Sequence, residues 1–538
     1  MGNFDDDVPV STGYSPKQQQ QNQQQPYLPP QQPYYPQYQA PVPSYQQQQQ
    51  PIYSNQPYQQ PYYSAQPQPQ QQYNAHAPLL KKGDNINDID QIDIHGNQHE
   101  PIEGQYVYED NCQKFPEAPK YQDVLYTILF VLHLVGLGVI FGVTFTESSR
   151  ESFVSNFYGV RYERVLIVIG VSSIVSLIYV MGWLRIAAKH AKGLINFTFL
   201  FNLALCVVTT VFAFIYNQIL LGVLFLISTI LTFFWYLVFR KRIDFSAALL
   251  TSTIELLQRF PSAFKLGYIS LFVNIVWLFI WSAIYFRIYY VFDQNTFYGL
   301  SVYMVFSFYW VANVMKNVVH TTISGLFASW YFLEGTDVGM PENPTLKSFK
   351  RTMTTSFGSI CFGSLLVAII TTLRYLAQQL MNSDNNFVKF IGCLINCFLA
   401  IFQSIIEFFN IYAYTQVAIY GKSYCEAAKD TFQLFKHRCA DIIINDDFIS
   451  TALSMSVFFG AIVGGIIGGI VSYCVYGTSV DGLFTFFTTL TFVLIALEVV
   501  YSGVVSTIVC FLMEPKILKA SKPEIYQLYT STYKKIVL

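Results

Sequence analysis

The chain has 538 residues, of which 52% are hydrophobic and 12% are charged, and its formal net charge is −1. Because a soluble protein carries about 25% charged residues, this composition excludes a soluble enzyme. Apolar runs of more than 18 residues recur through most of the chain, and each can cross a hydrocarbon layer of roughly 30 Å. The sequence therefore predicts an all-α, polytopic membrane protein, and it shows no basic run that would favour nucleic-acid binding.

Residues 1–118 form a polar N-terminal segment, rich in Gln, Pro and Tyr as far as about residue 75 and more acidic beyond it. This composition lacks the aliphatic side chains that would offset the entropy of ordering, so we predict a disordered cytoplasmic tail. Its start, residues 1–6, has neither the basic residues nor the apolar core of a signal peptide,. We interpret it as a solvated tether, with recruitment of tail-binding proteins as the alternative.

Ten apolar segments follow in a predicted transmembrane domain, residues 119–515, and residues 516–538 form a cytoplasmic C-terminal tail. The segments are Val124–Phe145, Val165–Leu184, Leu194–Tyr216, Ile219–Phe239, Gly267–Tyr290, Tyr298–Phe332, Phe357–Leu380, Phe387–Tyr420, Ser450–Tyr476 and Leu483–Met513. Fifteen Lys and Arg residues fall in loops on the side of the N-terminal tail, and five fall on the opposite side. By the positive-inside rule, this bias predicts ten transmembrane helices with both termini in the cytoplasm.

The sixth and eighth segments, Tyr298–Phe332 and Phe387–Tyr420, are each about 35 residues long, well beyond the roughly 20 residues needed to cross. Such helices either tilt and project into the cytoplasm or break at mid-membrane, as the helices of many transporters do. The ninth segment carries Gly460, Gly464 and Gly468 at four-residue spacing. This spacing lets another helix pack closely against it, and a moving helix interface is the alternative.

Three ionisable residues lie at comparable depth near the centres of the sixth, eighth and tenth segments: Lys316, Glu407 and Glu498. The polar residues around the lysine are Asn313, Asn317 and His320. Each charge costs roughly 2.5–3.5 kcal/mol in the middle of a membrane, so it needs an explanation. One interpretation is a polar substrate path, in which a carboxylate neutralises a cation or carries a proton. The other is a buried Lys–Glu pair that fixes helix packing.

Aromatic rings offer a second way to hold a cation. The candidates for an aromatic lining are Trp277, Trp281, Tyr309 and Trp310. Trp277 and Trp281 are one turn apart and share a helix face, and such rings attract quaternary ammonium groups through cation–π interactions. For each ring, ordinary packing is the alternative. Two ionisable residues, His133 and Arg374, are weaker candidates, and His133 is better interpreted as a core histidine with satisfied hydrogen bonds.

Catalytic and cofactor-binding motifs are incomplete or absent in the sequence. Gly421-Lys422-Ser423 resembles the end of a phosphate-binding loop, but Gln416 stands where its first glycine belongs,. The sequence has no nucleophile elbow and no H-E-x-x-H motif. Cys393 and Cys397 share a helix face, but no nearby His or carboxylate completes a metal set. We therefore expect no enzymatic activity, no metal and no cofactor.

Three blocks of sequence resemble the choline transporter-like family. The stretch from Phe409 to Ala428, FNIYAYTQVAIYGKSYCEAA, is similar to the family signature. Ser324–Phe332 resembles the end of the family's sixth span, and Ser356–Leu365 resembles the start of its seventh. The resemblance covers about residues 120–525, and the Gln/Pro/Tyr tail and short outer loops look most like the fungal pH-nine-sensitive branch.

The resemblance implies ten spans with cytoplasmic termini, a plasma-membrane location and the transport of small organic solutes. Joined to the intramembrane charges, it predicts transport of choline or a related organic cation by uniport or proton-coupled exchange. In this hypothesis Glu407 and Glu498 compensate the substrate's charge, and Lys316 is their ion-pair partner. The alternative hypothesis is a non-transporting membrane scaffold whose N-terminal tail recruits partners.

Overall fold

The computed structural model describes residues 120–144, 162–336 and 338–532, and within these ranges it contains helices and no strand. Nine of the described helical stretches are long and apolar enough to cross a membrane. The predicted all-α, polytopic fold is therefore confirmed. The predicted disordered tail, residues 1–118, lies outside the described residues, and the cytoplasmic location of both termini stays a prediction.

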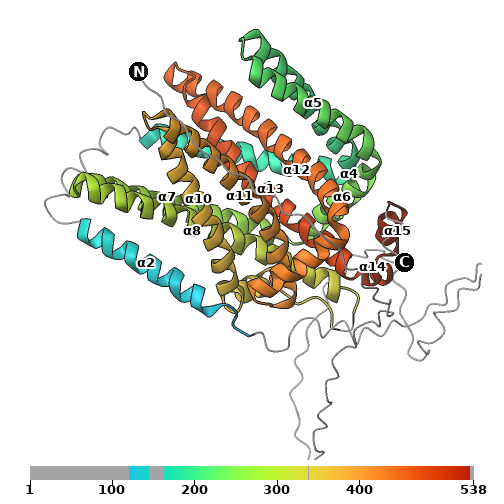
Figure 1. The fold of residues 1–538 in the computed structure, drawn as a ribbon. Helices are drawn as coiled ribbons and strands as arrows, with labels where there is room; N and C mark the ends of the chain where they lie inside the picture. Colours follow the sequence, from blue (N-terminus) through green and yellow to red (C-terminus); the bar gives the residue numbers. More distant parts are fainter. Residues whose placement is uncertain (1–119, 145–161, 337, 533–538) are drawn as a thin grey trace, which may run out of the picture. The chain divides into compact units, whose positions relative to one another are not determined.

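Figure 1 shows the helices in chain order along the colour bar. They are α2 (Val124–Thr144), α4 (Tyr162–Ile215), α5 (Ile219–Phe239), η3 (Arg240–Arg242), α6 (Ile243–Arg259), α7 (Ser262–Val291), α8 (Gln294–Leu333), α9 (Pro344–Met353), α10 (Phe357–Met381), α11 (Asn386–Tyr420), α12 (Tyr424–Tyr476), α13 (Asp481–Met513), α14 (Pro515–Ser521) and α15 (Pro523–Thr532).

The second and third predicted segments lie in one helix, α4, which explains why nine apolar stretches are found where ten were predicted. This helix has 54 residues, and its backbone leaves the helical region at His190 (φ −132°, ψ 32°). At a rise of 1.5 Å per residue it is about 80 Å long, more than twice the roughly 30 Å thickness of the hydrocarbon layer. Its length and its bend support two crossings, so we retain ten transmembrane helices as a prediction.

The long sixth and eighth segments are continuous helices, α8 and α11, of 40 and 35 residues. In the second half of α8, every residue from Asn317 to Phe332 is buried. The end of α8 therefore runs into a protein core rather than breaking at mid-membrane.

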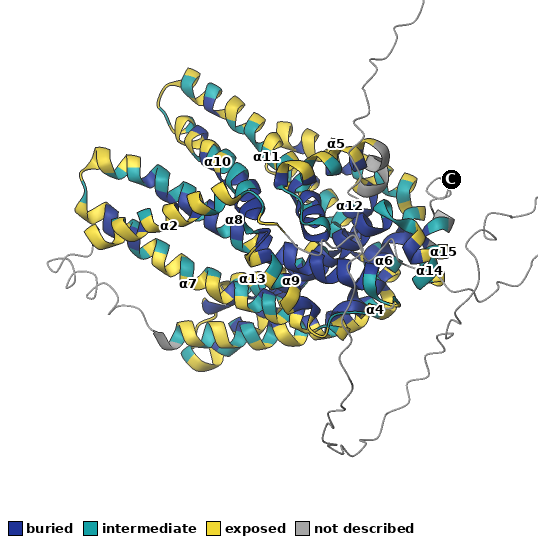
Figure 2. Cartoon of the chain, turned by 90° about the horizontal axis from the view of Figure 1, so that it is seen from below, coloured by how far each residue is buried: buried dark blue, intermediate teal, exposed yellow. Residues whose placement is uncertain are grey.

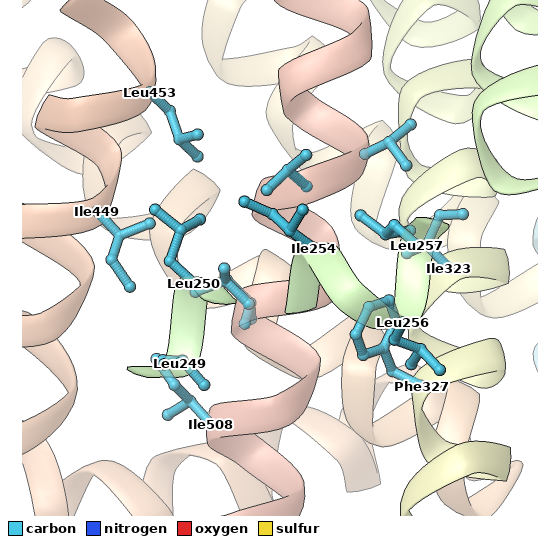
Figure 3. Close-up of a cluster of buried hydrophobic side chains, with 14 of the residues drawn as sticks. Leu249, Leu250, Ile254, Leu256, Leu257, Ile323, Phe327, Ile449, Leu453 and Ile508 are labelled. Atoms are coloured by element: carbon cyan, nitrogen blue, oxygen red, sulfur yellow. The ribbon is translucent and has the colours of Figure 1, made fainter. Parts of the chain in front are cut away.

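That core forms around α6, a helix that lies in a stretch predicted to be a loop. Its side chains Leu249, Leu250, Ile254 and Leu257 are fully buried. Figure 3 shows them packed against residues of three other helices: Ile323 and Phe327 of α8, Ile449 and Leu453 of α12, and Ile508 of α13. Away from this core the helices expose their side chains, as Figure 2 shows for α7. These exposed side chains are largely apolar, as expected for a surface that faces lipid,.

Glycines on α12 allow α13 to pack directly against its backbone. A Cβ atom on Gly464 would lie 2.2 Å from Oγ1 of Thr489, and one on Gly468 would lie 2.2 Å from Oγ1 of Thr485. Both distances are far shorter than a van der Waals contact. The packing role predicted for this glycine stripe is confirmed.

We expect Gly464→Ala to lower the apparent melting temperature of the purified protein, because the added methyl forces α12 and α13 apart. Overpacking of this kind costs about 1–3 kcal/mol. Gly469→Ala is the matched control, since its Cβ would meet no atom closer than 3.7 Å. Both variants gain the same helix propensity. Equal melting temperatures for the two variants, measured in detergent, would contradict the prediction.

Candidate functional site

A polar cavity of about 360 Å³ lies between α8, α10 and α11. Its lining consists of Asn313, Lys316, Asn317, Val367, Ser404, Glu407, Phe408, Asn410 and Ile411. The structure therefore brings together four of the six predicted polar candidates, from helices far apart in the sequence. A larger cavity of about 680 Å³ between α12 and α13 has no charged residue in its lining. We consider the polar cavity the better site, because a charge exposed at this depth needs a functional or structural reason.

Residue spacing explains how two helices build one polar wall. On α8, Asn313 and Lys316 or Asn317 are three or four residues apart, and on α11 the same interval separates Ser404 from Glu407. Side chains at these intervals lie above one another on a helix face. Each helix thus presents a polar stripe to the other, and the cavity lies between the two stripes.

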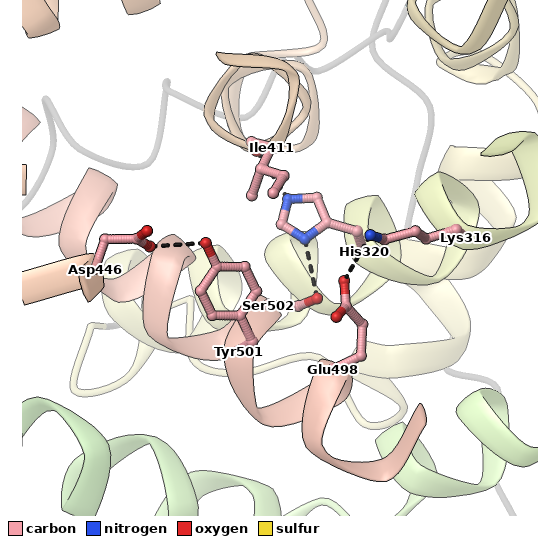
Figure 4. Close-up of polar contacts among 7 residues, drawn as sticks. All are labelled: Lys316, His320, Ile411, Asp446, Glu498, Tyr501 and Ser502. Atoms are coloured by element: carbon pink, nitrogen blue, oxygen red, sulfur yellow. Dashed lines mark hydrogen bonds and ion pairs between the residues drawn. The ribbon is translucent and has the colours of Figure 1, made fainter. Parts of the chain in front are cut away.

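Lys316 forms an ion pair across to α13. Its Nζ atom lies 3.3 Å from Oε1 of Glu498, and both side chains keep partial exposure. Figure 4 shows the two groups facing each other. Glu498 also lines a separate cavity of about 260 Å³ with Tyr501. The ion pair therefore stands between two cavities, with the lysine lining one and the glutamate the other.

Glu407 is held differently from Glu498. Its Oε1 atom accepts a hydrogen bond of 2.6 Å from Nε2 of Gln403, and Oε1 of Gln403 accepts one of 2.7 Å from Nη1 of Arg374. Arg374, a weaker candidate in the sequence, thus reaches Glu407 through an amide rather than directly. The arrangement orients the carboxylate towards the cavity that it lines.

His320 lies behind the cavity wall and joins three helices. Its ring is only 3% exposed, with Nε2 2.8 Å from the Ile411 carbonyl oxygen and Nδ1 2.9 Å from Oγ of Ser502. Because a carbonyl can only accept, Nε2 carries the proton, and Nδ1 accepts from the Ser502 hydroxyl. Figure 4 shows this bridge between α8 and α13. The arrangement satisfies a neutral imidazole and supports a packing role.

The four predicted aromatic rings do not line this cavity. Trp310 is buried, and its indole N–H donates to the Cys361 carbonyl at 3.1 Å. Trp281 donates to the Met304 carbonyl at 2.8 Å, and its ring stacks on Tyr285. Trp277 and Tyr309 both pack against the apolar cluster that contains Trp310, and Trp277 also packs against the cluster that contains Met304. The ring that does line the cavity is Phe408.

His133 is a core histidine with both ring nitrogens bonded, as its sequence context predicted. Nε2 lies 3.1 Å from Oγ of Ser307, and Nδ1 lies 2.9 Å from the hydroxyl of Tyr303. These bonds tie α2 to α8. They leave no ring nitrogen for a substrate in this conformation.

A polar cluster that was not predicted from the sequence lies at the start of the α12 span. The Asp446 carboxylate is buried and accepts hydrogen bonds from the hydroxyls of Tyr501, at 2.7 Å, and Tyr412, at 3.3 Å. Its neighbour Asp447 accepts from the indole of Trp235 at 2.9 Å. The available signal was three consecutive polar residues, 445–447, between apolar ones.

Comparisons with known proteins agree with the signature blocks. The profile of the plasma-membrane choline transporter family matches residues 223–516, which include the whole polar cavity and Glu498. A CTL-like protein of Dictyostelium discoideum is 40% identical over 431 residues, covering 79% of this chain and 78% of its own length. Protein PNS1 of Debaryomyces hansenii is 30% identical over 473 residues, covering 79% and 91%. Protein PNS1 of Saccharomyces cerevisiae is 28% identical over 459 residues, covering 78% and 85%. The chain therefore belongs to the choline transporter-like family.

Proposed function

We propose that the protein transports a small organic cation, choline or a relative of it, across the plasma membrane by uniport or proton-coupled exchange. The observation that supports this most is the polar cavity with Glu407 in its wall. Its volume of about 360 Å³ lies at the lower end of the range for small-ligand sites, roughly 300–1,000 Å³. A cavity of this size suits a compact ammonium ion.

Charge neutralisation explains how a cavity containing a lysine can accept a cation. The ammonium of Lys316 lies 3.3 Å from Glu498, which offsets its charge. Glu407 has a neutral amide as its hydrogen-bond donor, so its carboxylate keeps its attraction for a cation. In this conformation the substrate's methyl groups would meet Phe408 rather than the four predicted rings.

Uptake of labelled choline into proteoliposomes tests this function. Saturable uptake above that of empty liposomes supports the transporter, and its dependence on an imposed pH gradient separates proton coupling from uniport. If protein shown to be folded takes up no choline, choline is excluded as the substrate. A screen of other organic cations in the same vesicles then tests the wider proposal.

Deleting residues 1–118 should leave the choline uptake rate within about twofold of the full chain, because the cavity and its supporting helices all lie after residue 119. Uptake per molecule of reconstituted protein is the measurement. A scaffold whose tail recruits partners should instead lose its cellular effect on deletion. Loss of uptake by a truncated protein that still folds would contradict a self-contained transport domain.

A further inference from the structure

The residues just before α2 are clamped against two distant parts of the chain. The backbone N–H of Gln122 donates to the Thr355 carbonyl at 2.9 Å, and its side-chain amide donates to the Gly421 carbonyl at 3.1 Å. A Cβ atom on Gly358 would lie 2.3 Å from the Gln122 carbonyl oxygen. Glycine at 358 therefore permits this close approach. The clamp joins the entry to α2 with the start of α10 and the loop between α11 and α12.

Asp123 is the centre of the clamp. Its backbone is left-handed, with φ of 51°, a conformation in which Asp and Asn are enriched. Its Oδ2 atom accepts hydrogen bonds from the Ser359 hydroxyl and from the backbone N–H of Tyr424, each at 2.7 Å. Hydrogen bonds to a charged carboxylate are stronger than neutral ones. One side chain thus holds both neighbouring elements.

Tyr424 carries the connection from this clamp to the cavity. Its buried phenol donates a hydrogen bond to Oδ1 of Asn410, a residue of the cavity lining. The amide of Asn410 in turn donates to the Gly363 carbonyl at 3.3 Å. Burial raises the pKa of Tyr424 to about 12, so the phenol keeps its proton at neutral pH. Asp123, Tyr424 and Asn410 thus form one continuous path of contacts.

We propose that Asp123 is a positioning residue for transport. It fixes the α11–α12 loop so that Tyr424 holds Asn410 in place within the cavity wall. Release of the clamp frees Tyr424 and alters the polar lining that the substrate meets. This inference rests on the proposed function, and it links the point where the N-terminal segment enters α2 to the substrate site.

Two substitutions separate the carboxylate from the backbone geometry. Asp123→Gly keeps the left-handed conformation and removes the acceptor, whereas Asp123→Asn keeps both the conformation and an acceptor oxygen. We expect Asp123→Gly to raise the KM for choline about tenfold, the size of effect of one charge-assisted hydrogen bond. Asp123→Asn should stay within about threefold of the unchanged protein. Equal KM values for the two variants overturn the proposal.

A double-mutant cycle tests the path through Tyr424. Tyr424→Phe removes the hydroxyl bond to Asn410, so adding Asp123→Gly to it should change KM little further. Residues acting through one network are non-additive, whereas independent residues multiply their effects on KM. If the two substitutions multiply their effects on KM, the proposed role of Asp123 is overturned, whereas the proposed transport function is not affected.

A measurement without substrate separates this inference from the transport proposal. Val367 is buried and lines the same cavity as Asn410, so a cysteine introduced there reports on the wall. In Val367→Cys protein, Asp123→Gly should speed maleimide labelling of residue 367 severalfold, read by peptide mapping. Asp123→Asn should not. Unchanged labelling overturns the inference, whereas absent choline uptake in the parent protein counts against the proposed function alone.

Discussion

Replacing Glu498 by Gln should cut choline uptake about 100-fold, although Glu498 does not line the cavity that holds Glu407. The substitution removes the carboxylate 3.3 Å from the ammonium of Lys316. The lysine then presents an unneutralised charge to the cavity, where it repels the substrate and attracts Glu407. At a separation near 4 Å, charges in such a setting interact by about 4 kcal/mol, which makes a loss of this size reasonable. Initial uptake rates at equal protein content are the measurement.

The double variant Lys316→Met, Glu498→Gln decides between an indirect and a direct role for Glu498. Removing both charges leaves Glu407 facing the cavity without a competing cation, so uptake should recover to within about tenfold of the unchanged protein. Glu524→Gln, an exposed carboxylate at the start of α15, is the control for loss of a negative charge. A double variant as inactive as the single one would show that Glu498 acts on the substrate itself.

Much of the polar cavity could be predicted from the sequence, because depth and helical spacing are both properties of the sequence. Lys316 and Glu498 lie near the centres of segments that run in the same direction, so an ion pair between them was a natural hypothesis. The pairing partner was harder to choose. Which carboxylate the lysine meets depends on how α8 packs against α11 and α13, and hydropathy carries no information on that rotation.

The positions of the aromatic rings could not be predicted from helical spacing alone. Trp277 and Trp281 share a helix face, but a shared face does not show whether it meets a cavity or a neighbouring helix. The structure shows that the indole N–H groups of Trp281 and Trp310 bond to backbone carbonyls of neighbouring segments. These bonds satisfy the rings within the protein and keep them away from the cavity wall.

Segment boundaries account for the remaining differences. Hydropathy predicts that the ninth segment begins at Ser450, after the polar residues, and so leaves Asp446 outside it. Hydropathy predicts a loop at α6, because Asp244, Glu255 and Arg259 lower the mean hydropathy of this stretch. The apolar residues of α6 recur at the helical period and the charged residues lie between them. This periodicity indicates a helix with one buried face.

Replacing Glu407 by Gln should abolish saturable choline uptake, with a fall in uptake efficiency of more than about 100-fold. The carboxylate is the negative group of the cavity that is held by a neutral amide, Gln403, rather than by a cation. A glutamine keeps the size and the hydrogen bond but loses the charge that offsets the substrate's desolvation. Ser404→Ala, a change in the same lining, should alter uptake by less than about threefold.

Thermal stability separates this role from a structural one. A carboxylate at this depth costs roughly 2.5–3.5 kcal/mol. If Glu407 is retained for its function, Glu407→Gln should therefore have an unchanged or higher melting temperature. A residue retained for packing should instead lose stability together with uptake. Glu407→Asp keeps the charge but withdraws it by one methylene, so it should retain measurable uptake with a raised KM. If the Asp and Gln variants are both inactive and have lowered melting temperatures, Glu407 has a structural role in helix packing and the substrate site lies elsewhere.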